Sequence, residues 1–188
     1  MIRLFDLLFS FLGLIILLPV LIVLWIIGIF ENGSPLFKQK RVGHNQKVFV
    51  LFKFRTMHID TKSVPTHLVN KLMVTKFGSF LRRTKLDELP QLFNVLIGDM
   101  SFVGPRPCLI TQKKLINQRK KKGVFKRKPG ITGLAQVLGI TMKNPILLAK
   151  TDLKLIRQLN LYYYFYYIVI TFFIFLKKNN KLYVGINH

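Results

Sequence analysis

A long apolar segment near the N-terminus constrains the fold more than any other feature of the chain. Residues 7–30 are almost unbroken apolar sequence, with Pro19 near the middle. A straight helix of this length would extend about 36 Å, which is enough to span a bilayer. Because proline lacks an N–H and kinks or breaks a helix, two structures remain open. One is a kinked spanning helix, which the length favours. The other is a re-entrant pair of short helices that enters and leaves by the same face.

The remainder of the chain is strongly basic. Of its 188 residues, 30 are Lys or Arg and 7 are Asp or Glu, which gives a net charge of +23, while 51% are hydrophobic. This combination indicates a protein at an anionic membrane surface and suits anionic substrates. Because nearly all the positive charge follows the apolar segment, the positive-inside rule places the body in the cytoplasm. No nucleic-acid partner is expected, since no recognition-module pattern is present and such a protein has little use for the apolar segment.

A β-hairpin is expected after the apolar segment. Residues 48–56 are rich in Val and Phe, which is typical of a strand, and residues 43–45 (Gly-His-Asn) mark a turn before it. Lys53 and Arg55 end this strand on the same face. Two bases at the end of a buried strand can receive an anion, and a solvated strand end explains the pattern equally well.

Two adjacent carboxylates, Asp87 and Glu88, are unusual in a chain with so few acids. Apolar residues recur around them at helical spacing: Leu86, Leu89, Phe93 and Leu96. Pro90 fits only the first turn of such a helix, which places the acidic pair at or near its N-terminus. The helix dipole there favours ionised carboxylates and bound phosphate. The alternative, from the residues alone, is that the acids merely complement the dipole of their own helix.

Two further expectations concern the surroundings of the acidic pair. The face of the predicted helix opposite the apolar residues carries Asp87, Gln91 and Asn94. Residues 104–107, Gly-Pro-Arg-Pro, are expected to form a rigid turn that presents Arg106.

The second half of the chain gives weaker signals. Residues 119–122 are all basic, which is typical of a solvated face, with contact to membrane headgroups as the alternative. Lys128 precedes a Pro-Gly turn whose backbone amides can cradle a phosphate. Residues 159–176 are uncharged and rich in tyrosine, which predicts an interfacial helix or hairpin, with a second spanning helix as the rival. Cys108 is the only cysteine, so neither an intramolecular disulfide nor a cysteine-based metal cluster is expected.

Three separate stretches carry a resemblance to a known family. They are SPLFKQKRVGHNQKVFVLFKFRTM (residues 34–57), FGSFLRRTKLDELPQLFNVLIGDMSFVGPRP (residues 77–107) and KPGITGLAQV (residues 128–137). Together they closely resemble the bacterial sugar transferase family, the monotopic phosphoglycosyl transferases. The resemblance runs from the N-terminal apolar segment to Asp152 and is to the minimal, single-domain form.

The resemblance implies an enzyme that moves a sugar 1-phosphate from a UDP-sugar to polyprenyl (undecaprenyl) phosphate. UMP is released, and glycan assembly begins. Asp87 is implied as the nucleophile that forms a covalent phosphosugar intermediate, and Glu88 as the ligand of the Mg²⁺ cofactor. Basic residues are implied as a clamp for the substrate phosphates: Lys53, Arg55, Arg82, Arg106 and Lys128. Other residues are expected to shape the site: Pro19, Pro90, Pro105, Pro129 and Gly130.

The resemblance also implies a fold and a location. The expected fold class is α+β and mostly helical, with a re-entrant membrane helix broken at Pro19, a small β-hairpin and interfacial amphipathic helices. The expected divisions are a membrane helix with its linker (1–32), a cytoplasmic transferase domain (33–158) and an aromatic membrane-interface helix with a basic tail (159–188). The protein is expected to be monotopic, in contact with membrane lipids on the cytoplasmic face of the bacterial inner membrane.

Several positions depart from the family pattern. Leu18 precedes Pro19 where serine is usual, Lys85 stands where serine is common, and Lys128 replaces an arginine. Lysine keeps the charge of arginine but loses the planar fork that binds phosphate. These departures leave an alternative, in which the chain is a catalytically impaired membrane-associated homologue with a scaffold role.

Overall fold

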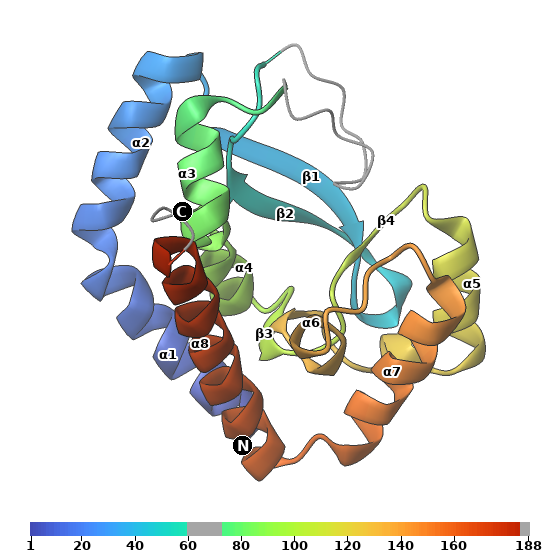
Figure 1. Ribbon diagram of the computed structural model, residues 1–188. Coiled ribbons are helices and arrows are strands. Elements are labelled where there is room, and N and C mark those ends of the chain that lie inside the picture. Colours follow the sequence, from blue (N-terminus) through green and yellow to red (C-terminus); the bar gives the residue numbers. More distant parts are fainter. Residues whose placement is uncertain (60–72, 185–188) are drawn as a thin grey trace.

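The fold is α+β and mostly helical, as expected (Figure 1). The computed structural model describes residues 1–59 and 73–184. The helices are α1 (Ile2–Ile16), α2 (Leu18–Asn32), α3 (Lys76–Thr84), α4 (Gln91–Ile97), α5 (Lys113–Lys121), α6 (Leu134–Val137), α7 (Pro145–Gln158) and α8 (Leu161–Val184), and the 3₁₀ turns are η1 (His44–Gln46), η4 (Leu86–Glu88) and η5 (Val124–Lys126). The strands β1 (Leu36–Val42), β2 (Val48–Phe54) and β4 (Cys108–Leu109) form an antiparallel sheet in the order β2-β1-β4, and β3 (Ser101–Val103) pairs in parallel with β5 (Gly130–Thr132).

The apolar segment forms two helices with a sharp bend between them. Helix α1 ends at Ile16, α2 begins at Leu18, and the pair is bent by 62°. Pro19 lies in the first turn of α2, where its missing N–H removes no helical hydrogen bond. The predicted break is therefore confirmed. Within residues 1–59 and 73–184, no single helix has the length and apolar character needed to cross a membrane, whereas α1 and α2 taken together do.

Helix α1 buries polar side chains alongside Phe5 and Phe9, and its outer face is apolar. Asp6 is only 2% exposed. Its Oδ1 accepts hydrogen bonds from Ser101 Oγ (2.9 Å), the Phe102 N–H (3.0 Å) and Tyr164 Oη (3.0 Å). Arg3 donates to two carbonyls in the last turn of α4. The exposed face is apolar: Leu4, Leu8, Phe11 and Ile15. A helix on a water-soluble protein exposes polar side chains, so the apolar outer face of α1 suits an apolar environment around it.

Strands β1 and β2 form the predicted hairpin. They pair antiparallel, with Val42 opposite Val48 next to the turn. Asn45 and Gln46 in the connecting turn η1 have φ angles of 50° and 63°, in the left-handed region. Asparagine tolerates that conformation better than glutamine does, so the hairpin stores backbone strain at Gln46.

The segment at residues 86–97 differs from the single helix that its spacing predicts. The acidic pair lies on η4, a separate 3₁₀ turn, and α4 begins only at Gln91, after Pro90. Lys85, with φ of 61°, ends α3 and begins η4, so the chain changes direction just before the acids. Helix α4 has 7 residues and starts beyond the acidic pair, so its dipole acts on the carboxylates less than a first-turn position would allow.

The prediction that Gln91 and Asn94 lie on the face away from the packed apolar residues is also wrong. Asn94 is fully buried and Gln91 is 3% exposed, whereas the apolar Phe93 is 46% exposed. The physical reason is the free edge of β2, whose backbone groups need partners. Asn94 supplies them, since its Nδ2 donates to the Val50 carbonyl (2.7 Å) and its Oδ1 accepts from the Phe52 N–H (3.0 Å). This side chain thereby fixes α4 against β2.

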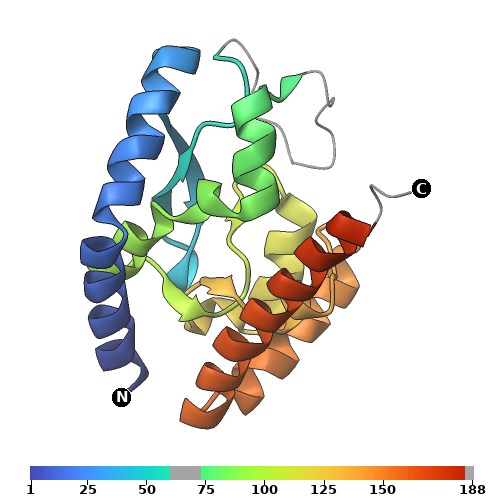
Figure 2. The same ribbon diagram turned by 60° about the vertical axis from the view of Figure 1, so that its left-hand side comes forward.

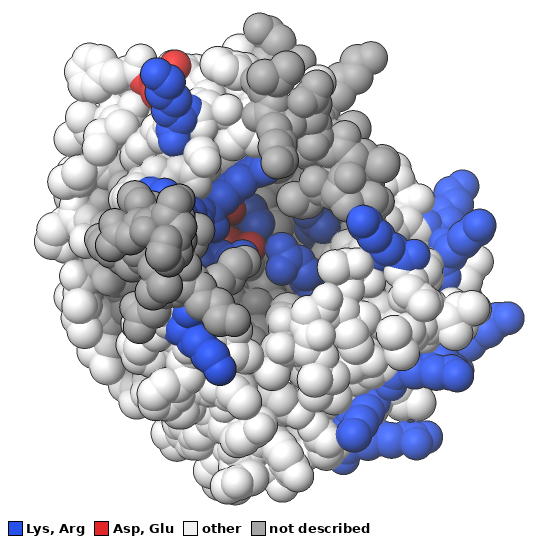
Figure 3. Space-filling model, viewed as in Figure 1, with Lys and Arg blue, Asp and Glu red and all other residues white. Residues whose placement is uncertain are grey.

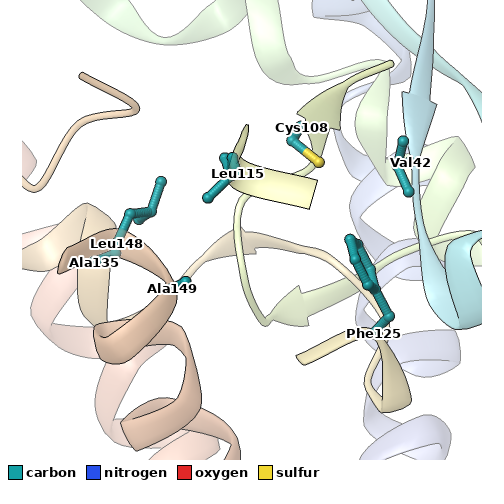
Figure 4. Close-up of a cluster of buried hydrophobic side chains, with 7 residues drawn as sticks. All are labelled: Val42, Cys108, Leu115, Phe125, Ala135, Leu148 and Ala149. Atoms are coloured by element: carbon teal, nitrogen blue, oxygen red, sulfur yellow. The ribbon is translucent and has the colours of Figure 1, made fainter. Parts of the chain in front are cut away.

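Buried apolar clusters join these elements. The cluster drawn in Figure 4 comes from β1, β4, α5, η5, α6 and α7 and consists of Val42, Cys108, Leu115, Phe125, Ala135, Leu148 and Ala149. A second cluster joins α2, β2 and α3 through Leu24, Phe54 and Leu81, with Leu86 and Leu89 packed against it. This second cluster holds the acidic segment in place.

The aromatic segment near the C-terminus forms one continuous helix, α8, rather than a hairpin (Figure 2). Tyr164 and Tyr167 are buried, while Tyr162 and Phe172 are exposed. Helix α8 contacts α1 through the rings of Phe5 and Phe165, whose centroids lie 5.1 Å apart. The two apolar helices therefore pack together through one face and present aromatic side chains on another.

Candidate active site

Charged groups from three elements meet at the acidic pair. Lys53 of β2 donates from Nζ to Glu88 Oε1 at 2.7 Å, and Nη2 of Arg106 lies 3.3 Å from the same oxygen. Asp87 is 8% exposed, and its Oδ2 lies 3.9 Å from Lys53 Nζ. The strand β2, the turn η4 and the turn at residues 104–107 thus assemble one site from segments that are far apart in the sequence.

Glu88 stays ionised although it is largely buried. Burial raises the pKa of its carboxyl group, but the positive charges of Lys53 and Arg106 outweigh this effect and lower the pKa to about 2. Burial lowers the pKa of Lys53, and the Glu88 carboxylate opposes that change. Glu88 therefore remains an anion throughout the neutral range.

Asp87 behaves differently from its neighbour. Burial raises the pKa of Asp87, Lys53 lowers it, and the negative charge of Glu88 raises it again, so that the net pKa lies above the ordinary value. Two adjacent carboxyl groups are thus driven in opposite directions, a pattern that accompanies a division of chemical roles. Asp87 is the more basic and less tightly paired of the two.

The surface of the protein is hollowed near the centre of one face. Figure 3 shows acidic and basic side chains meeting in this hollow, which lies over the region where β2, α3 and the neighbouring turns converge. A recess lined by cations with carboxylates at its floor suits an anionic substrate such as a diphosphate.

The other predicted phosphate ligands lie at different distances from the acidic pair. Arg82 is close enough for its charge to lower the pKa of Asp87, and its Nε donates to Thr56 Oγ1 at 2.8 Å. Arg55 instead donates to the Ser34 carbonyl at 2.9 Å and lies over the ring of Phe37.

Lys128 lies in a different neighbourhood. Its Nζ and the guanidinium of Arg3 both lie beside Gly98, at the end of α4. Burial lowers the pKa of Lys128, and the charge of Arg3 lowers it further. The structure therefore brings Lys53, Arg106 and Arg82 to the acidic pair and places Arg55 and Lys128 elsewhere.

The predicted phosphate cradle at the Pro-Gly turn is occupied by backbone. The Gly130 N–H donates to the Pro105 carbonyl (2.9 Å), and the Pro129 carbonyl accepts from the Ser101 N–H (2.9 Å). A Cβ on Gly130 would lie 2.0 Å from the Gly104 nitrogen, so only glycine fits there. The Gly130 N–H and the Pro129 carbonyl are therefore used within the protein, where they fix the turn that carries the site arginine.

Two buried charged residues near the site were not predicted from the sequence. Arg119, which opens the basic run expected to be solvated, is 1% exposed and pairs with the fully buried Asp152. Arg119 Nη1 also donates to the Arg106 carbonyl at 2.8 Å. Two signals in the sequence could have indicated this pair. Leu115 and Arg119 lie on one face of α5 by helical spacing, and Asp152 is notable because the chain has few acids.

The donor groups at the site fit a magnesium ion that is completed by substrate. Within the described part of the chain, no group of three or more His, Cys, Asp or Glu side chains is arranged to hold a metal. Mg²⁺ commonly binds through one or two carboxylates together with substrate phosphates, so an all-protein cage is not required. Glu88, with Asp87 beside it, supplies that kind of donor set.

Comparisons with a family model and with known proteins indicate the same family. The model of the family described as "Bacterial sugar transferase" matches residues 1–178. An uncharacterized sugar transferase of Haemophilus influenzae is 38% identical over 154 residues, covering 73% of this chain and 32% of the relative. The UDP-glucose:undecaprenyl-phosphate glucose-1-phosphate transferase of Xanthomonas campestris pv. campestris is 42% identical over 142 residues, covering 69% and 29%. The exopolysaccharide production protein PSS of Rhizobium leguminosarum bv. phaseoli is 39% identical over 149 residues, covering 73% and 74%.

The relatives differ in length. The chain spans less than a third of the Haemophilus and Xanthomonas proteins and about three quarters of the Rhizobium protein. The family match covers nearly all of the chain, including the acidic pair and the bent apolar helices. The chain therefore belongs to the bacterial sugar transferase family.

Proposed function

We propose that the chain transfers a sugar 1-phosphate from a UDP-sugar to polyprenyl phosphate, with release of UMP. The observation that carries this proposal is the Asp87–Glu88 pair, in which one carboxylate is locked by two cations and the other has a raised pKa. Several relatives bear names that describe such a transfer, to undecaprenyl phosphate, from UDP-glucose or of galactose phosphate. Because these names differ in the sugar, the proposal stops at the class of UDP-sugars.

The proposed reaction has two displacements at phosphorus. In the first, an Asp87 oxygen attacks the β-phosphorus of the UDP-sugar, and the bond from that phosphorus to the bridging oxygen breaks as UMP leaves. In the second, an oxygen of polyprenyl phosphate attacks the same phosphorus, and the Asp87 carboxylate is expelled as an anion. Lys53 and Arg106 stabilise the negative charge on the phosphoryl oxygens. Glu88 would hold Mg²⁺, which would supply positive charge against the negative charge of the departing phosphate.

The proposed location follows from the apolar helices. The bend at Pro19 and the apolar outer face of α1 support a re-entrant helix pair that enters and leaves the bilayer on the cytoplasmic face. The excess of Lys and Arg in the body supports the same side. A lipid-linked acceptor phosphate at that surface would reach the site without leaving the membrane.

A UMP-release assay tests the function. Detergent-solubilised protein is incubated with undecaprenyl phosphate, Mg²⁺ and each member of a panel of UDP-hexoses and UDP-N-acetylhexosamines. The expected result is UMP release with at least one donor, lost on chelation with EDTA and reduced by at least about a thousandfold in Asp87→Asn. Robust turnover by Asp87→Asn, checked by mass for deamidation, would exclude Asp87 as the nucleophile. Inactivity of the wild type on the whole panel would support the scaffold alternative.

A further inference from the structure

A buried ion pair near the site makes a contact that stabilisation of the fold does not explain. Arg119 on α5 and Asp152 on α7 are 1% and 0% exposed. Nε and Nη2 of Arg119 lie 2.9 Å and 2.8 Å from Asp152 Oδ2. Burying two charges carries a desolvation cost that roughly offsets their attraction, so stability alone is a weak reason for such a pair. A further contact of the guanidinium, beyond Asp152 and the neighbouring Cys108 side chain, is therefore informative.

That contact is made with the backbone of the site arginine. Nη1 of Arg119 donates to the Arg106 carbonyl oxygen at 2.8 Å. The side chain of the same residue, Arg106, reaches Glu88 Oε1 at 3.3 Å and is 42% exposed. One residue thus has its carbonyl held from inside the protein and its guanidinium in the site.

A second arginine holds the next carbonyl. Nη1 of Arg41, on β1, donates to the Pro107 carbonyl at 3.0 Å. Burial lowers the pKa of Arg41 to about 10, with the charge of Arg106 acting in the same direction, so Arg41 remains protonated at neutral pH. Two cations from different elements therefore anchor two successive peptide groups of the turn.

The local sequence shows why such anchoring matters. Pro105 and Pro107 flank Arg106, and each proline has a φ angle fixed by its ring. The freedom left to the turn lies mainly in the torsions of Arg106 itself. A hydrogen bond to the Arg106 carbonyl fixes the orientation of that peptide plane and, with it, the direction in which the side chain leaves the backbone.

We infer that Arg119, held by Asp152, is a positioning residue that aims Arg106 at Glu88 and at the donor diphosphate. This inference rests on the proposed phosphosugar transfer. It gives the helix pair α5 and α7 a role in the reaction, although neither helix carries a residue that touches the acidic pair. Small misplacements of a catalytic group are known to lower rates by large factors, so the effect is measurable.

A double-mutant cycle separates positioning from a purely structural role. Arg119→Met combined with Asp152→Leu replaces the ion pair by apolar side chains of similar size, an exchange that proteins often tolerate. The UMP-release rate is compared with and without Arg106→Ala. We expect a loss of about tenfold to a hundredfold in the wild-type background and less than about twofold in the Arg106→Ala background. Equal losses in both backgrounds would overturn the inference.

Two further variants complete the double-mutant cycle. Arg119→Lys retains the charge opposite Asp152 but has a single nitrogen, which cannot serve both Asp152 and the Arg106 carbonyl in the fork geometry of arginine. It replaces the double variant in the same cycle if that protein does not fold. Lys120→Met, at the exposed neighbouring position on α5, is the matched control and is expected to change the rate by less than about twofold.

A second readout does not depend on catalysis. In protein labelled with [¹⁵N]arginine, the Arg106 Nε signal is assigned by its absence in Arg106→Ala. We expect this signal to be sharp in the wild type and broadened or shifted in the Arg119 variants, whereas an unchanged signal would overturn the inference. If the wild type releases no UMP from any donor, the proposed function fails, and the Arg106 signal still decides whether Arg119 positions it.

Discussion

Lys53 distinguishes two carboxylates that are adjacent in the sequence. Its Nζ lies 2.7 Å from Glu88 and 3.9 Å from Asp87, so the close ion pair is made with Glu88. Arg106 adds a second cation on the same Glu88 oxygen. Glu88 is thereby held as an anion, while Asp87 keeps a carboxylate that is free of a tight ion pair. A nucleophile needs that freedom, because a tightly paired oxygen attacks poorly.

Acid unfolding tests the state of Glu88. Its pKa is about 2 in the folded protein and 4.5 as the ordinary value, so its ionisation stabilises the fold fully above pH 4.5. This contribution, on the order of 3 kcal/mol, is lost as the pH falls from about 4.5 towards 2. Urea unfolding between pH 2 and 6 should therefore show a shallower pH dependence in Glu88→Gln than in the wild type. Identical curves for Glu88→Gln and wild type would contradict the ion-pair geometry.

Elements that depend on local sequence were predictable, and those that depend on distant partners were not. The Pro19 break and the hairpin at residues 43–45 follow from backbone chemistry within a few residues. The burial of Asn94 depends on the edge of β2, more than forty residues away, and no periodicity within the helix reports it. Arg119 is similar, since its partner Asp152 lies on another helix.

The site shows the same division. The acidic pair and three of the predicted cations, Lys53, Arg82 and Arg106, are brought together. Arg55 and Lys128 have the right charge in the right motifs, but their strand and turn direct them to Ser34 and to the end of α4. Residue type and motif therefore indicate which groups are candidates, while the tertiary packing decides which of them meet.

The hairpin turn is expected to gain stability from one substitution. Gln46 has a φ of 63°, which costs a residue with a Cβ about 1–2 kcal/mol. Gln46→Gly removes that strain but gives the unfolded chain more freedom, worth up to about 1 kcal/mol. The expected net effect is a stabilisation of about 0.5–1 kcal/mol, measured by urea unfolding in detergent. Gln46→Ala keeps the Cβ and is expected to give no gain, so equal gains in the two variants would show that strain is not the cause.

At the level of the whole molecule, the apolar helices are part of the body that forms the site. Asp6 on α1 binds the backbone and a side chain of β3, and the chain leaves β3 directly into the turn that carries Arg106. Tyr164 brings α8 to the same carboxylate. One buried carboxylate thus links helices α1 and α8 to the strand that precedes the site turn.

Asp6→Ala tests this connection. The substitution leaves the Phe102 N–H and two hydroxyl groups without their acceptor, which should lower the free energy of unfolding by about 3 kcal/mol or more. Tyr164→Phe removes one of the three hydrogen bonds and should cost about 1 kcal/mol. The two losses should not add, because Tyr164→Phe has nothing left to break in the Asp6→Ala protein. Additive losses would show that Tyr164 is stabilised by other contacts.

The covalent intermediate is the central claim, and intact-protein mass spectrometry tests it most directly. The protein is mixed with the UDP-sugar that supports UMP release, in the presence of Mg²⁺ and without polyprenyl phosphate. The predicted result is a mass increase equal to one sugar phosphate, located on Asp87 by fragmentation, lost on addition of undecaprenyl phosphate and absent in Asp87→Asn. A mass increase that persists in Asp87→Asn, or rapid transfer to the acceptor by that variant, would contradict the proposed mechanism.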